Sequence, residues 1–239
     1  MRTESESQAF RSEAETRIRL RCDKCGGKDP ECECVLKFQR EADGFDACVP
    51  KDFWHVEDMK IEHNVGAFET RVIPYCKRLR NVRYDGYGMF LSGDNGVGKT
   101  TFASYVLMRA MRNGWTGYYT TLPKLDHDIK RGFGDDTARD RLEWYLGSDF
   151  VVIDEVAKER FKGGPGDSYT RMQVERILKQ RYDDSAPVIL ATNATIEEIG
   201  QAYGKTISSV ITGKYLEVML SDGDQRERSR ERMEKKILG

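Results

Sequence analysis

A glycine-rich run followed by lysine and threonine is the chemically most specific segment of this chain. Residues 93–100 read Gly-Asp-Asn-Gly-Val-Gly-Lys-Thr, which matches the phosphate-binding loop G-x-x-x-x-G-K-[ST]. The glycines lack side chains, so backbone N–H groups can surround the phosphates of a nucleoside triphosphate. The lysine can reach the β- and γ-phosphates, and the threonine hydroxyl can coordinate Mg²⁺. The residues expected to contact ATP are Gly93, Asp94, Asn95, Gly96, Val97, Gly98, Lys99, Thr100 and Thr101.

Two polar strand ends downstream supply the other groups that nucleotide hydrolysis needs. Residues 149–155 are an apolar strand that ends in two carboxylates. Asp154 is expected to hold Mg²⁺, often through water, together with the loop threonine. Glu155 is expected to orient and deprotonate the attacking water, unless the pair only caps the next helix. Residues 187–192 form another apolar strand, and Asn193 after it either holds the lytic water or is only a turn residue. The predicted catalytic residues are Lys99, Asp154, Glu155 and Asn193.

Four cysteines near the N-terminus have the types and spacing of a metal site. Their pattern is C-x₂-C, six residues, then C-x-C. Four thiolates this close in sequence can converge on one tetrahedral Zn²⁺ and leave no open position for catalysis, so a structural zinc is expected. Alternatively, the thiols are only buried, since a free cysteine packs like a small hydrophobic residue. The predicted zinc ligands are Cys22, Cys25, Cys32 and Cys34, and the predicted magnesium ligands are Thr100 and Asp154.

The elements that must position these groups alternate along the chain. β-rich or apolar segments occur at residues 89–92, 116–121, 149–155, 187–192 and 215–220. Helical spacing follows the phosphate loop and ends at Asn113-Gly114, so that helix begins at the phosphates and its dipole favours an anion there. A second helix is indicated by Val174, Ile177, Leu178 and Tyr182. Alternating strands and helices predict an α/β fold with a parallel, doubly wound sheet flanked by helices.

Composition and charge limit the classes of protein that this chain can be. The chain has 239 residues, which is enough for one medium-sized domain and a small one. Its formal net charge is −1, so it lacks the overall positive charge that would indicate binding to nucleic acid. No stretch approaches the roughly 20 apolar residues that span a bilayer, and the first residues lack an apolar signal core. We therefore expect a cytoplasmic protein without membrane contact, in which thiols stay reduced and disulfides are disfavoured.

Domain organisation follows from where these features lie. The cysteine segment has no apolar core of its own, so metal binding would supply the folding free energy of a short module. We expect a small zinc-stapled N-terminal module with its linker over residues 1–70 and an ATPase domain over residues 71–239. Within the latter, the charged tail 224–239 mixes both signs and is predicted to be a solvated helix or frayed end.

The order of these motifs resembles the AAA+ family of ATPases. Within it, the chain looks like the DnaC/DnaI-type helicase loaders of bacteria and their phages, close relatives of the transposition ATPase IstB. The likeness extends from Cys22 to Arg226. It is carried by the cysteine run, Pro50-Lys-Asp-Phe53, the phosphate loop, Val151–Glu155, Arg181-Tyr182 and Ile189-Leu-Ala-Thr-Asn193.

The resemblance implies an ATPase that binds ATP, Mg²⁺ and Zn²⁺ in a bacterial host cell. Loaders of this family use the N-terminal module to bind a hexameric DnaB-type replicative helicase. Their ATPase domains self-associate into an oligomeric ring or spiral, contact single-stranded DNA, and hold the helicase ring open during replication initiation. The compact size suits a phage or plasmid protein.

One departure from the family concerns an arginine that reaches the γ-phosphate of a neighbouring subunit. It is expected in the helix before the last strand, but residues 207–213 read Ile-Ser-Ser-Val-Ile-Thr-Gly. Such an arginine can contribute ~10³-fold or more to the rate, so slow intrinsic hydrolysis is expected. The cations that could substitute are Lys205, Lys214, Arg171, Arg181 and Arg226.

Two basic segments are candidates for contacts with single-stranded DNA. The first interleaves cations with Tyr75 and Tyr84, which fits either a base-stacking surface or a solvated helix face. Its cations are Arg71, Lys77, Arg78, Arg80 and Arg83. The second comprises Lys158, Arg160 and Lys162, ahead of a Gly-Gly-Pro-Gly loop that could follow DNA in a pore.

Two other functions remain open at this point. The chain could be an IstB-like transposition regulator that assembles on duplex DNA, although the N-terminal cysteines favour a loader. It could also be a zinc-dependent nucleic-acid adaptor with a vestigial ATPase site. The intact Lys99, Thr100, Asp154 and Glu155 argue against that second alternative.

Overall fold

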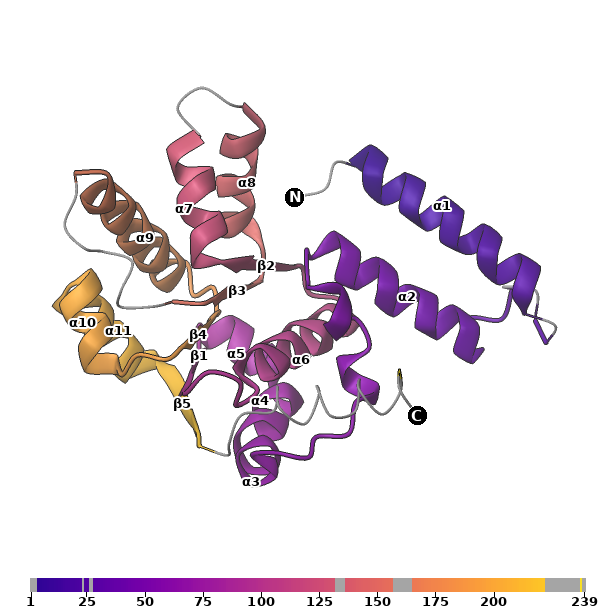
Figure 1. Ribbon diagram of the computed structural model, residues 1–239, viewed down its shortest axis with the longest axis horizontal. Coiled ribbons are helices and arrows are strands. Elements are labelled where there is room, and N and C mark those ends of the chain that lie inside the picture. The colour runs from indigo at the N-terminus through magenta and orange to yellow at the C-terminus, as the bar shows by residue number, and fades with distance from the viewer. Residues whose placement is uncertain are drawn as a thin grey trace.

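Five short strands form one parallel sheet between two layers of helices (Figure 1). The computed structural model describes all residues except 1–3, 23, 26–27, 132–135, 157–164, 222–236 and 238–239. The sheet order is β2-β3-β4-β1-β5, and every neighbouring pair is parallel. The predicted α/β fold with its parallel sheet is confirmed. The strands are β1 (Gly88–Gly93), β2 (Gly117–Thr121), β3 (Phe150–Asp154), β4 (Val188–Thr192) and β5 (Tyr215–Leu220).

The helices connect these strands and also form the N-terminal part of the chain. Residues 51–53 and 56–58 form 3₁₀ turns, and residues 68–72 a π-helical turn. Among the described residues no helix has the length and apolar character that crossing a membrane requires. The helices are α1 (Glu4–Arg21), α2 (Glu33–Asp46), α3 (Val65–Ala67), α4 (Ile73–Lys77), α5 (Leu79–Asp85), α6 (Lys99–Arg112), α7 (Leu122–Arg131), α8 (Asp136–Gly147), α9 (Pro165–Asp183), α10 (Ile196–Tyr203) and α11 (Lys205–Lys214).

The central strands of the sheet are apolar on both faces, as is typical of a parallel sheet covered by helices. Every residue of β3 and of β4 is buried. Successive strand residues point to opposite faces, so Val152 packs with α6 while Val151 and Ile153 pack with residues of α7, α9, α10 and α11. Of the predicted apolar positions of α9, Val174, Ile177 and Leu178 are buried, whereas Tyr182 is 39% exposed.

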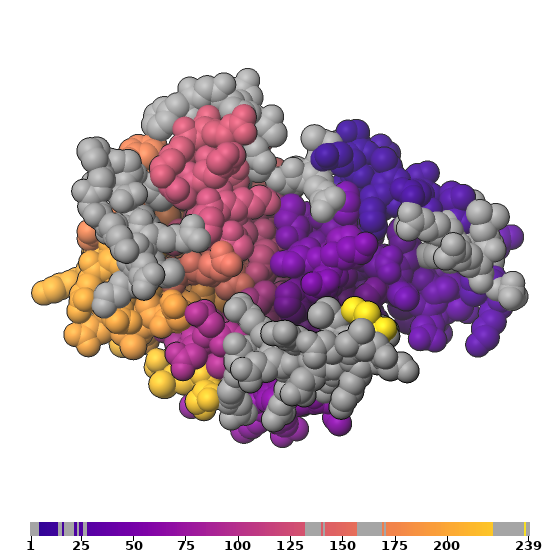
Figure 2. Space-filling model, viewed as in Figure 1, coloured from indigo at the N-terminus to yellow at the C-terminus, as the bar shows by residue number. Residues whose placement is uncertain are grey.

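The N-terminal region is a helical hairpin that packs on the α6 side of the sheet. Helix α1 lies along α2, and Phe10 of α1 stacks on Phe45 of α2 with ring centroids 4.3 Å apart. Phe45 and Trp54 belong to the same buried cluster as strand and α6 residues. In the space-filling view, the N-terminal residues gather at one end of the molecule and residues 165–220 at the other (Figure 2). The boundary at residue 70 remains a prediction, and the buried cluster extends across it.

The hairpin also reaches the edge of the sheet. The backbone N–H of Tyr119 in β2, an edge strand, donates to the carbonyl of Ala47, just after α2, at 2.8 Å. A paired edge strand presents fewer free backbone groups to other chains. The N-terminal segment and the sheet are thus joined by a backbone hydrogen bond as well as by apolar packing.

Candidate nucleotide site and metal centre

The phosphate loop joins the carboxyl end of β1 to the first turn of α6. Three of its glycines, Gly93, Gly96 and Gly98, have positive φ of 145°, 81° and 103°, a conformation that side chains disfavour. At Gly93 a Cβ would lie 2.2 Å from the carbonyl oxygen of Leu220, so only glycine fits there. Helix α6 then begins at Lys99, and its N-terminal N–H groups and dipole favour a phosphate in front of it.

Lys99 lies over this loop. Its Nζ donates to the carbonyls of Gly93 and Asp94 at 2.8 and 2.7 Å. The ammonium is therefore held on the loop itself, which is where the lysine of this motif meets the β- and γ-phosphates. Its role in binding phosphate stays a prediction.

The carboxylate of Asp154 is the centre of the hydrogen-bond network beside the loop. Its Oδ2 accepts from the Thr100 hydroxyl at 2.6 Å and from the Tyr119 hydroxyl at 2.7 Å. Its Oδ1 accepts from the Glu155 N–H at 2.7 Å. Mg²⁺ prefers oxygen ligands such as hydroxyls and carboxylates, so the positions of Thr100 and Asp154 are compatible with their predicted role as magnesium ligands.

Sequence reasoning missed Tyr119. Burial and the neighbouring Asp154 raise the pKa of its phenol, so the hydroxyl stays protonated and donates. The signal that could have found it is register: Tyr119 pairs with Val152, which places Asp154 two residues further along β3 on the same face. Only the pairing of β2 with β3 reveals that neighbourhood.

Glu155 and Asn193 lie at the ends of neighbouring strands. Glu155 is exposed and has φ of 55°, a conformation that is uncommon for a residue with a side chain and that occurs at functional sites. The segments after β3 and β4 are tied together, since Val156 N–H donates to Ala191 O at 3.0 Å and the Thr192 hydroxyl donates to Val156 O. Asn193 is exposed beside this junction. Their catalytic roles remain predictions.

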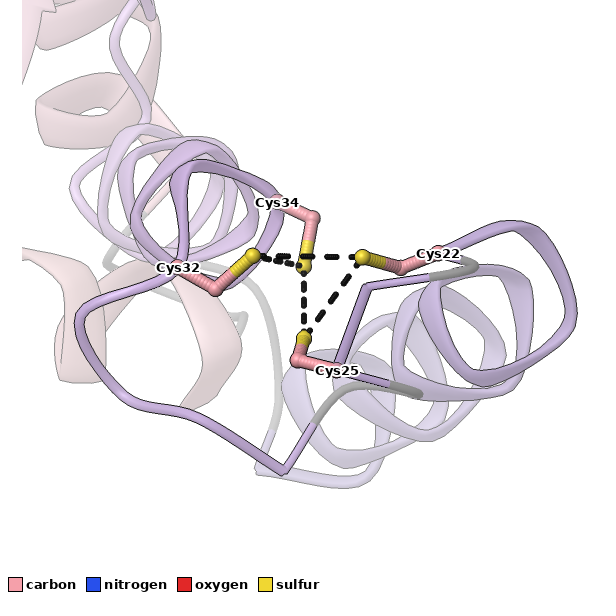
Figure 3. Close-up of side chains that lie close together, drawn as sticks. All are labelled: Cys22, Cys25, Cys32 and Cys34. Carbon is pink, nitrogen blue, oxygen red and sulfur yellow. Dashed lines mark hydrogen bonds between the residues drawn. The ribbon is translucent and has the colours of Figure 1, made fainter.

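The four predicted zinc ligands converge at the turn of the α1–α2 hairpin (Figure 3). Cys22 Sγ lies 3.5 Å from Cys25 Sγ and 3.9 Å from Cys32 Sγ, and Cys34 Sγ lies 3.4 Å from the sulfurs of Cys25 and Cys32. All four sulfurs fall within 4.8 Å of one another. A tetrahedral zinc with Zn–S bonds of about 2.3 Å needs S–S separations of roughly 3.8 Å, so the cluster fits one ion.

Close spacing of the four sulfurs disfavours deprotonation of all of them at once. Burial and hydrogen bonds with the thiols of Cys22, Cys25 and Cys32 raise the pKa of Cys34. Four thiolates at this separation repel one another unless a positive charge lies between them. A bound metal ion would supply that charge.

The basic run near α4 and α5 divides into exposed and structural residues. Arg83 pairs with Asp149 at 2.8 Å and donates to Ser185 O at 3.1 Å, and Tyr75 is buried with its hydroxyl on Tyr87 O. Arg83 and Tyr75 therefore make structural contacts within the protein, and their side chains are not available to bind DNA. Arg71, Lys77, Arg78, Arg80 and Tyr84 are exposed. The second basic segment, Lys158, Arg160 and Lys162, lies outside the described residues.

The structure corrects one candidate for the γ-phosphate cation. Arg181 is fully buried and donates to five backbone carbonyls, so it cannot reach a neighbouring subunit. Lys214 lies at the end of α11 where β5 starts, which is the opposite end of a parallel sheet from the phosphate loop. Arg171 and Lys205 are exposed and remain candidates, while Arg226 and the rest of the 224–236 segment lie outside the described residues.

The sheet order, the phosphate loop and the two carboxylates at the end of β3, Asp154 and Glu155, define an AAA+ P-loop ATPase fold. Residues 54–220 match the family model described as IstB-like ATP binding protein. The chain therefore belongs to the IstB-like family of ATP-binding proteins, as the resemblance to DnaC- and IstB-type ATPases predicts.

Parts of this chain are similar to known proteins in sequence or in structure. A putative ATP-binding protein of insertion sequence IS5376 from Geobacillus stearothermophilus is 27% identical over 139 residues, which are 58% of this chain and half of that relative. The crystal structure of the DnaC helicase loader superposes with a TM-score of 0.60 at 20% identity, over 72% of this chain and 99% of that one.

Two further solved structures are similar. DnaI has a TM-score of 0.56 at 15% identity, over 69% of this chain and 89% of that chain. The replication initiator DnaA, bound to AMPPCP and single-stranded DNA, has a TM-score of 0.57 at 19% identity, over 79% of this chain and 56% of that chain. At these identities the likeness establishes the fold.

Proposed function

We propose that the chain is an ATP-dependent loader of a hexameric replicative DNA helicase onto single-stranded DNA. The observation that supports this proposal is the arrangement of Lys99, Thr100 and Asp154 around the loop after β1, with a cysteine-clustered hairpin in the same buried cluster as the sheet. The first part suits an ATP-controlled switch, and the second presents a module for a partner protein. The fold shared with DnaC and DnaI supports the same assignment.

The residues divide the work of an ATPase among them. The loop glycines and Lys99 bind the phosphates, and Thr100 and Asp154 hold Mg²⁺, which neutralises charge on the phosphate oxygens when bound. Glu155 accepts a proton from the attacking water, and Asn193 orients that water and reports the γ-phosphate. Hydrolysis is slow in the isolated chain, since α11 contains no arginine. A brisk ATPase rate without DNA or helicase would contradict this.

The same proposal includes the remaining partners. ATPase domains associate side by side into a ring or spiral, and Arg171 or Lys205 of one subunit approaches the γ-phosphate of the next. The exposed cations Arg71, Lys77, Arg78 and Arg80 contact single-stranded DNA. The protein acts in the cytoplasm of a bacterial host cell, where reduced thiols can hold a metal.

The cysteine cluster holds one structural zinc. Elemental analysis of the purified chain is expected to give one zinc per molecule, and Cys25→Ser is expected to lose it because three thiolates leave the tetrahedron incomplete. Cys48→Ser is the matched control and keeps the metal, since Cys48 lies outside the cluster. A chain that folds without any bound metal, or a Cys25→Ser variant that retains it, contradicts the proposal.

The experiment that tests the loader proposal is light scattering after size-exclusion chromatography. The chain is mixed with the host's replicative helicase, with and without ATP and single-stranded DNA. A discrete complex that changes with ATP and is weakened by Cys25→Ser supports the proposal. The absence of any complex under all conditions rejects it.

A second function is favoured by the insertion-sequence relative. That protein is named as a putative ATP-binding protein of an insertion sequence, so this chain could instead assemble on duplex DNA as a transposition regulator. The same chromatography distinguishes the two, because a regulator forms ATP-dependent filaments on duplex DNA and leaves the helicase unbound. A Lys99→Ala chain that functions fully would instead support the adaptor with a vestigial ATPase site.

A further inference from the structure

We propose that Tyr119 is a positioning residue of the nucleotide site, whose hydroxyl fixes the Asp154 carboxylate for Mg²⁺. The inference rests on the proposed magnesium–ATP site and deepens it. Tyr119 lies on β2, away from the phosphate loop and the β3 end in sequence. Its action is through Asp154, which is the residue that would meet the metal.

The contact is short and shielded from water. The Tyr119 side chain is 4% exposed and Asp154 is also 4% exposed. The O–H to Oδ2 distance of 2.7 Å joins a neutral donor to an ionised acceptor, and such charge-assisted bonds are among the stronger ones. Buried hydrogen bonds of this kind hold a side chain in one orientation.

The ring itself is held at its other end. The Tyr119 backbone N–H donates to Ala47 O at 2.8 Å, and the side chain packs in the cluster that contains Val106, Leu107 and Phe150. Tyr119 is thus fixed at its backbone by the segment after α2 and at its hydroxyl by the Asp154 carboxylate. Neither its backbone nor its ring can move without disturbing buried neighbours.

Asp154 Oδ2 accepts hydrogen bonds from two hydroxyls, those of Thr100 and Tyr119. The Thr100 hydroxyl donates a hydrogen bond to Asp154 Oδ2, which leaves the hydroxyl lone pairs available to Mg²⁺. The Tyr119 proton occupies the same oxygen from the β2 side. Without it, the carboxylate keeps the Thr100 hydroxyl and the Glu155 N–H as donors but loses its support from the β2 side, so Thr100 and Asp154 present a less firmly fixed pair to the metal.

A matched control exists in the same fold. Tyr145 is 1% exposed, and its hydroxyl donates to Asp128 Oδ2 at 2.7 Å on the other face of the sheet. Tyr119→Phe and Tyr145→Phe therefore remove the same kind of buried hydroxyl-to-carboxylate bond. Only the first lies beside the phosphate loop.

The test measures the affinity of the full chain for a fluorescent ATP analogue, once with Mg²⁺ and once with EDTA. We expect Tyr119→Phe to bind about ten-fold more weakly with Mg²⁺, which is the loss of one hydrogen bond to a charged group, and like wild type in EDTA. Tyr145→Phe is expected to match wild type in both. In an Asp154→Asn background, Tyr119→Phe is expected to have no further effect.

The outcomes separate the inference from the proposed function. Wild-type affinity that is the same with Mg²⁺ and EDTA overturns both. Magnesium-dependent binding by wild type that Tyr119→Phe leaves unchanged, or an equal loss in EDTA, overturns the inference alone. So does a Tyr119→Phe chain that fails to fold, judged by circular dichroism, while Tyr145→Phe folds.

Discussion

A single buried guanidinium joins the end of one helix to the starts of two strands. Arg181 donates to the carbonyls of Tyr145, Leu146 and Ser148 at the end of α8, and to those of Asp149 and Pro187 ahead of β3 and β4. Burial lowers the pKa of Arg181 to about 10, so it remains charged at neutral pH. A cation at a helix C-terminus is favourable.

Replacing this residue should cost stability. Arg181→Met leaves several buried carbonyls without a donor, and we expect the free energy of unfolding to fall by about 3 kcal/mol or more in urea titration. Arg171→Met, an exposed position on the same helix, should change it by less than about 0.5 kcal/mol. An Arg181→Met chain of wild-type stability would show that these five hydrogen bonds do not stabilise the fold.

The ion pair of Arg83 with Asp149 predicts a pH dependence. Burial raises the pKa of Asp149, but the Arg83 and Thr116 hydrogen bonds outweigh it and hold the pKa below its usual value. A depressed carboxyl pKa stabilises the fold above the unfolded value near 4 and loses that contribution as pH falls through the folded value. Arg83→Met should therefore be less stable than wild type at pH 7, with the difference shrinking below about pH 4. A difference independent of pH in urea titrations would contradict this.

At the scale of elements, helix α2 packs against the indole of Trp54 at Gly44, where there is no room for a side chain. A Cβ on Gly44 would lie 2.3 Å from Trp54 Cδ1, and the indole is fixed by packing and by its Nε1–H to Val49 O at 2.9 Å. Gly44→Ala should lower the free energy of unfolding by about 1–3 kcal/mol through overpacking. Gly66→Ala, at a helical glycine with open space around it, should be neutral or slightly stabilising. Equal effects of the two substitutions would show that the Trp54 contact is loose.

The sequence predicts the strands well and the contacts between them poorly. Apolar runs place β1, β3 and β4 to within one or two residues, because burial on both faces leaves a local signal. The edge strand β5 is placed equally well although one of its faces is exposed. Tyr119 with Asp154, and Arg181 with the end of α8, are 35 and 36 residues apart. No local pattern specifies such pairs, since register and topology bring them together. Arg181 is misread for this reason: exposed and buried arginines look alike in a sequence.

At the scale of the whole molecule, nucleotide binding should stabilise the fold. Magnesium with a non-hydrolysable ATP analogue at 100 times its Kd adds about 2.7 kcal/mol, which raises Tm by roughly 5–10 °C for a chain of this size. Differential scanning calorimetry measures the shift. Lys99→Ala should abolish it and Lys179→Ala, exposed on α9, should keep it. A shift that survives Lys99→Ala would place the nucleotide elsewhere.

The two ends of the α1–α2 hairpin contain different kinds of contact, a cysteine cluster at one end and aromatic packing at the other. Sulfurs gather at the turn, whereas Phe10, Phe45 and Trp54 pack against one another at the base. Oxidation of the cysteines would consume the thiolates and release the turn, while the aromatic base, which has no oxidisable thiol, stays packed. Oxidation would then alter the hairpin turn while leaving the nucleotide site around Thr100 and Asp154 in place.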